Sequence, residues 1–267
     1  MPRIKHTAGL RKRAVRRSKA PIVDDAFEKT KGSCEGEASN ENPIRFLNRY
    51  KERRFAEIKH WSFIPERKVQ LALREYDVFL MGLMRRNWRQ LADPLFKYDA
   101  EVVYEFYANA WAGRQDVVER ESYVNVKWIP YDPKSINKFL GNLYPDPDEQ
   151  CTYHRLKATE NDFNNNKVAQ ALCIPNRSYQ RGPTGRQKRI QRKDMRTLAQ
   201  VWLTFMLANI VPIGHGSDLN VPHYNLLYSI IQEEYIVNVS RVIYDEIQKF
   251  VDLEVNQEKD KKHGVFS

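Results

Sequence analysis

Three groups of residues carry side chains that could bind a metal or perform catalysis. The first is Cys151 with His154, three positions later, and Cys173 as a third potential ligand. A structural zinc site needs four ligands, usually supplied by two close pairs, and the sequence holds no second pair. We therefore interpret these residues as two partly buried cysteines and a surface histidine, and we predict no metal site.

The second group is His215, Ser217 and Asp218, whose side chains are those of a hydrolytic triad. Triad members converge in space from different parts of a fold, whereas neighbours in one loop rarely face one another. We interpret residues 214–218 as the turn after an apolar helix, with Ser217 or Asp218 as a cap for the next helix.

The third group consists of carboxylates that could serve two-metal nuclease chemistry, namely Asp132, Asp162 and Asp194. Such carboxylates must converge from different elements, which the sequence alone does not establish. Asp132 precedes a proline and a helical pattern, so it is better explained as a helix cap.

Residues 182–185 lack the Lys-Ser/Thr ending of a phosphate-binding loop. We predict no catalytic residue and no cofactor, and we favour a protein without enzymatic activity over an enzyme.

The strongest positive signal is basic charge, because 44 Lys and Arg residues stand against 34 Asp and Glu residues, a net charge of +10. Such an excess favours anionic partners. Residues 11–19 match a nuclear-import signal, which we favour, and also a nucleic-acid-binding arm, and a solvated tail without a specific partner is the third interpretation. The residues predicted to make these contacts are Arg11, Lys12, Arg13, Arg16, Arg17 and Lys19.

A second basic stretch covers residues 181–196 and contains one acidic residue, Asp194. It leads directly into a strongly apolar helical pattern, and positive charge is unfavourable at the amino end of a helix. That conflict hints at an anionic partner. The candidate anion-binding residues are Arg186, Lys188, Arg189, Arg192 and Lys193.

Composition divides the chain into three parts. Residues 1–42 form a predicted disordered basic arm and acidic linker, residues 43–252 a folded domain, and residues 253–267 a polar tail.

An odd number of scattered cysteines, three in all, indicates a reducing compartment. No apolar run approaches the roughly 18 residues of a membrane helix, so we expect no membrane association.

The folded part is predicted to be mainly α, a single helical domain with one small β-hairpin. A helix should start at Pro43 with Asn42 as its cap. The β-branched and aromatic residues at 117–129 indicate the hairpin. A short helix should start after Asp132 and stop at Gly141, and the pattern at 194–211 is apolar nearly all round, as expected for a helix at the centre of a fold.

Six short runs are further landmarks of the folded part: 106–109 (FYAN), 126–140 (VKWIPYDPKSINKFL), 198–203 (LAQVWL), 209–212 (NIVP), 226–230 (LLYSI) and 236–239 (IVNV). Their order and spacing, from about residue 46 to residue 251, resemble the family named putative plant transposon protein domain. The resemblance implies an open reading frame associated with transposable elements, often retrotransposon-like ones. It implies no catalytic residues, because none are established for the family.

We therefore expect a transposable-element-derived plant protein that acts as a non-catalytic module binding nucleic acid or protein. The expected partners are nucleic acid through the basic segments, an import receptor, and a second copy of the chain. The expected location is the nucleus, with the cytoplasm as an additional site. The alternatives are a metal-dependent transposase or nuclease and a self-assembling coat-like retroelement protein.

Overall fold

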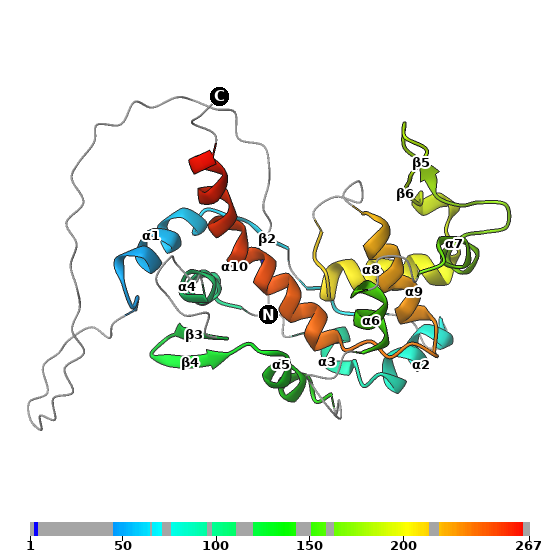
Figure 1. Ribbon diagram of the computed structural model, residues 1–267. Helices are drawn as coiled ribbons and strands as arrows, with labels where there is room; N and C mark the ends of the chain where they lie inside the picture. The colour runs from blue at the N-terminus through cyan, green and yellow to red at the C-terminus, as the bar shows by residue number, and fades with distance from the viewer. Residues whose placement is uncertain are drawn as a thin grey trace, which may run out of the picture.

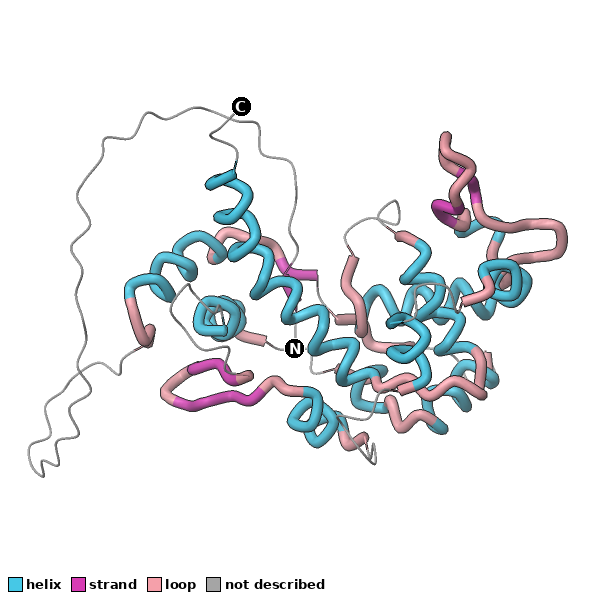
Figure 2. The backbone as a smooth tube through the Cα atoms, in the orientation of Figure 1, coloured by secondary structure: helices cyan, strands magenta, loops and turns pink. Residues whose placement is uncertain are grey.

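The computed structural model describes residues 3–4, 45–64, 66–70, 76–94, 98–110, 120–142, 151–158, 163–213 and 219–263. For residues 3–4, 63–64, 158 and 252–263 it describes the backbone alone. The prediction of a mainly helical fold is confirmed, as Figures 1 and 2 show. No described helix is long and apolar enough to span a bilayer. The helices are α1 Arg49–Ile58, α2 Asp77–Arg85, α3 Arg89–Ala92, α4 Ala100–Ala110, α5 Pro133–Leu140, α6 Thr152–Ala158, α7 Asn165–Leu172, the 3₁₀ helix η1 Arg192–Asp194, α8 Thr197–Asn209, α9 Val221–Ile231 and α10 Val239–His263.

The strands form antiparallel two-stranded pairs, β1 with β2, β3 with β4, and β5 with β6. The predicted hairpin is β3–β4, and both residues of its two-residue turn, Asn125 and Val126, have positive φ, as a type I′ turn requires. The other two pairs were not predicted. One of them joins residues 3–4 of the predicted basic arm to β2. The strands are β1 Arg3–Ile4, β2 Phe63–Ile64, β3 Glu121–Val124, β4 Lys127–Pro130, β5 Gln180–Arg181 and β6 Gln187–Arg189.

Helix α8 lies in a cluster of aromatic side chains, as its apolar sequence predicts. Trp202 and Phe205 of α8 are buried, and Phe79 of α2 packs edge-on against both, with ring centroids 4.4 and 5.8 Å away. Gly82 permits this approach, because a Cβ at that position would lie 2.7 Å from the Trp202 ring. The packing holds α2 in place against α8.

Helix α10 crosses the molecule diagonally in Figure 1 and packs against α5. Tyr244 of α10 stacks on Tyr131 with ring centroids 6.3 Å apart. Phe250 of α10 packs edge-on against Tyr107 of α4, with ring centroids 4.8 Å apart. These contacts bring together α4, α5 and α10, which are far apart in the sequence.

Local capping decides where several helices begin and end. Asp132 caps α5 as predicted, since its Oδ1 accepts hydrogen bonds from the backbone N–H groups of Lys134 and Ser135. Gly141 ends α5 with a φ of 65°, also as predicted. Helix α1 corrects a prediction, because residues 45–48 are not helical and α1 begins at Arg49 with Asn48 as its cap. The predicted start at Pro43 lies outside the described residues. Helix α10 continues to His263, into residues whose composition predicts a polar tail.

Candidate nucleic-acid interface

Two members of the candidate metal group come together, without forming a metal site. His154 Nδ1 lies 2.8 Å from Cys151 Sγ, and His154 Nε2 lies 3.4 Å from Asp245 Oδ2. Burial opposes ionisation of the Cys151 thiol, but hydrogen bonds from His154 and the Asn238 backbone N–H lower its pKa. Within the described ranges no three His, Cys, Asp or Glu residues could hold a metal. His154 is half-buried, which corrects the prediction of a surface histidine.

The structure brings no further catalytic candidates together among the described residues. Residues 214–218, with the His-Ser-Asp group, and Asp162 lie outside the described residues. Asp132 is a helix cap, and Asp194 lies 3.6 Å from the Arg177 guanidinium in an ion pair. Both carboxylates thus have local structural partners.

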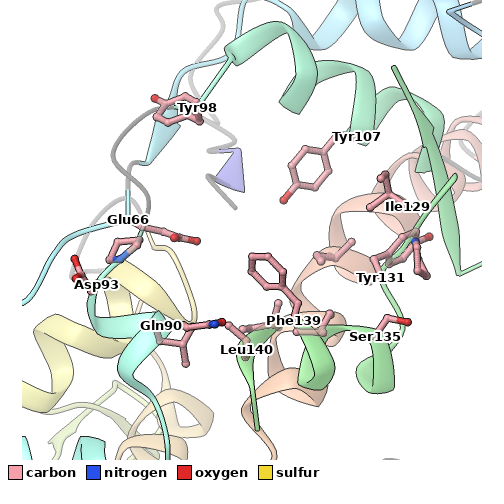
Figure 3. Close-up of a pocket in the computed structure, with 16 residues that line it drawn as sticks. Glu66, Gln90, Asp93, Tyr98, Tyr107, Ile129, Tyr131, Ser135, Phe139 and Leu140 are labelled. Atoms are coloured by element: carbon pink, nitrogen blue, oxygen red, sulfur yellow. The ribbon is translucent and has the colours of Figure 1, made fainter. Parts of the chain in front are cut away.

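A cavity of about 530 Å³ lies between α4, α5 and α10 and is shown in Figure 3. Figure 3 shows Tyr107 and Phe139 reaching toward its interior and Glu66 with Asp93 at one end. Asp93 pairs with Lys68 at 2.7 Å. The predominantly apolar lining suits an apolar group, as in many small-molecule sites. Sequence reasoning missed this cavity because its walls come from segments remote from one another in the chain.

The second basic stretch forms a β-hairpin that projects beside α7 in Figures 1 and 2. Gln180 of β5 lies opposite Arg189 of β6. At the tip, the Gly185 N–H donates to the Gly182 carbonyl at 3.0 Å, and Gly185 has a φ of 74°, which favours glycine. The chain then enters η1. We call residues 180–194 the basic hairpin.

The base of the basic hairpin is anchored in the core. Tyr179 and Ile190 flank its two strands, and both are buried. The Tyr224 hydroxyl of α9 donates a hydrogen bond to the Ile190 carbonyl at 2.9 Å, and the Tyr179 and Tyr224 rings meet edge-on at 5.7 Å. Burial raises the pKa of Tyr224, which keeps this donor protonated. The hairpin is therefore held at a fixed position on the domain.

The six cations of the basic hairpin make no ion pair with any described carboxylate. Arg181 donates to the Gly185 carbonyl, Arg189 to Gln180 and Arg192 to Thr204, all uncharged acceptors. The other three, Arg186, Lys188 and Lys193, are exposed and contact no partner in the described part of the chain. All five predicted anion-binding residues thus belong to one hairpin with uncompensated charge.

One part of the sequence argument is corrected. Arg196 is the N-terminal cap residue of α8, and its positive charge is balanced by partners outside α8. Its guanidinium donates to the Cys173 carbonyl at 2.8 Å and to the Gln170 carbonyl at 3.2 Å, at the carboxyl end of α7. A cation is favourable at that end of a helix. The case for an anionic partner therefore depends on the basic hairpin and not on α8.

The predicted residues of the basic arm, Arg11 to Lys19, lie outside the described residues. The structure therefore does not place them relative to the basic hairpin.

The geometry defines a mainly helical domain that presents an uncompensated basic hairpin. Residues 84–259 match the family model described as "Putative plant retrotransposon-related domain", and this chain belongs to that family. The match confirms the predicted resemblance and includes the whole basic hairpin. No curated protein and no solved structure matches the chain.

Proposed function

We propose that this retrotransposon-related chain is a non-catalytic module that binds double-stranded DNA through the basic hairpin. The observation that carries the proposal is the clustering of six cations on one protruding hairpin without a described carboxylate partner. Lys and Arg side chains that contact phosphates release condensed counterions, and this release supplies most of the affinity of non-specific binding.

The shape of the hairpin favours DNA over RNA. A two-stranded β-ribbon fits the major groove of B-form DNA, which is about 12 Å wide. The major groove of A-form RNA is deep and narrow and excludes such an element. We therefore expect duplex DNA to bind more tightly than duplex RNA of the same sequence.

Charge reversal tests the proposal. Arg186→Glu combined with Lys188→Glu should weaken the binding of a fluorescent DNA duplex by about tenfold or more, because two attractive contacts become repulsive. The matched control is Arg53→Glu with Lys59→Glu at α1, where both residues are exposed. Equal loss of affinity in both double variants would show that net charge alone, and not the hairpin, governs binding.

The basic cluster at residues 11–19 supports a second proposal, nuclear import. Its composition matches an import signal. Removing residues 1–20 from a fusion too large for passive entry should shift the fusion to the cytoplasm. Unchanged nuclear signal would refute this assignment.

A further inference from the structure

A second cavity, of about 350 Å³, lies where the carboxyl end of α2 meets the amino end of α10. Two arginines and four asparagines line it, together with Trp88 and two valines, and none of its lining residues is acidic. Its volume falls within the range of small-molecule sites, about 300–1,000 Å³. Figure 1 shows the amino end of α10 near α5, away from β5 and β6, so this cavity is separate from the basic hairpin.

Arg86 provides a cation that lacks a counter-ion. Its guanidinium is half-buried, donates to the Gln232 carbonyl at 3.3 Å and lies 5.8 Å from the Trp88 ring. No described carboxylate pairs with it, because the nearby Glu233 is taken by Arg85. Burial and the adjacent charge of Arg85 lower the pKa of Arg86. A partly desolvated cation of this kind is stabilised when an anion binds beside it.

The amino end of α10 supplies hydrogen-bond donors to the same cavity. Asn238 caps the helix, since its Oδ1 accepts from the Arg241 backbone N–H at 3.2 Å. The backbone N–H group of Val239, which lines the cavity, has no acceptor among the described residues. The first turn contains no acidic side chain. Such a helix end favours an anion through its free N–H group and its dipole.

A buried side chain gives an independent indication of a ligand. Asn238 lines the cavity and is 2% exposed, yet its Nδ2 has no hydrogen-bond partner in the described part of the chain. The Oδ1 of Asn142, which lines the same cavity, is also enclosed without a partner. Buried polar atoms are normally hydrogen-bonded, so these atoms point to a polar ligand.

We propose that this cavity binds the phosphate group of a small molecule. Arg86 would balance one of the two negative charges, and the Val239 N–H group with Asn238 Nδ2 would donate to the phosphate oxygens. The Asn142 Oδ1 would accept a hydrogen bond from a hydroxyl of the ligand. The shared chemistry is a phosphate dianion, which either free phosphate or a phosphate monoester supplies.

Calorimetric titration of the full chain with inorganic phosphate and, separately, with AMP tests the proposal. Tighter binding of AMP identifies a phosphate ester as the ligand, and equal binding identifies free phosphate. Amide NMR should show the largest shift at Val239. Absence of binding by both probes at millimolar concentration would overturn the proposal.

Two variants show whether binding uses this cavity. Arg86→Gln removes the cation, and Asn238→Asp introduces a carboxylate while retaining a good helix cap, so the fold should persist. Each should weaken binding by about tenfold or more, because a charge-assisted contact is lost or replaced by repulsion. Arg53→Gln and, separately, Lys59→Gln change exposed residues outside both the cavity and the basic hairpin, so these variants should bind the probes as the unmodified chain does. Unchanged affinity in both cavity variants, or equal loss in the controls, would refute the site.

Discussion

Neutralising two cations of the basic hairpin should reduce the salt dependence of DNA binding by a calculable amount. Each phosphate contact contributes about 0.9 to the slope of log affinity against log salt concentration. If about four of the hairpin cations contact phosphates, the slope is about −3.6, and raising salt from about 50 to about 200 mM lowers the affinity roughly 150-fold. Arg186→Gln with Lys188→Gln removes two contacts, so the slope becomes about −1.8 and the loss about 12-fold.

Fluorescence anisotropy of a labelled duplex across a salt series measures this slope. Arg53→Gln with Lys59→Gln at α1 changes the net charge equally and lies outside the hairpin. Its slope should match that of the unmodified chain. If the hairpin variant also kept the full slope, its cations would not contact phosphates, and the reasoning from their missing carboxylate partners would be refuted.

Three further predictions concern the fold that positions the hairpin and the cavities. Gly82→Ala should lower the free energy of unfolding in urea by roughly 1–3 kcal/mol, because its Cβ would lie 2.7 Å from the Trp202 ring, and an unchanged value would contradict that packing. Tyr224→Phe should cost about 1–3 kcal/mol and speed amide exchange in the basic hairpin, since it removes the donor to the Ile190 carbonyl, and equal exchange rates would show that this bond does not anchor the hairpin. Burial opposes ionisation of Asp245, but the His154 imidazole 3.4 Å away and two nearby cations lower its pKa, so its stabilising contribution is present above pH 3.8 and is lost as pH falls through the lowered pKa. Urea titrations should therefore show Asp245→Asn less stable than the unmodified chain at neutral pH and equal to it in strong acid, whereas a pH-independent difference would contradict this linkage.

Elements specified by local rules could be predicted from the sequence. Helix α5 has a capping aspartate, a proline in its first turn and a glycine stop, so its bounds follow from nearby residues alone. Helix α8 follows from its apolar sequence. The start of α1 could not be placed, because Asn42 and Asn48 are both suitable cap residues by type and the sequence does not distinguish them.

The hairpin β5–β6 escaped prediction because Arg, Lys and Gln dominate its strands and leave no alternation of apolar and polar residues. The available signal was the turn at 182–185, with glycine at both ends, between two short segments flanked by Tyr179 and Ile190. The basic charge of this stretch is visible in the sequence itself. Its grouping on one projecting element required the structure.

Neither cavity could be read from the sequence, because each is enclosed by segments distant along the chain. The smaller one joins Arg86, directly after α2, to Asn238, directly before α10, and these residues lie far apart in the sequence. No local pattern marks Arg86 as unpaired, since its neighbour Arg85 has a carboxylate partner from the residues after α9. The missing counter-ion is a property of the tertiary structure.

The central claim is that the basic hairpin is the surface that contacts DNA. Amide NMR of the isotope-labelled chain during titration with a DNA duplex tests this claim most directly. We predict shift changes concentrated in residues 180–194 that disappear as salt is raised. Binding that leaves those amides unchanged and perturbs α1 or the α4–α5–α10 region would contradict it.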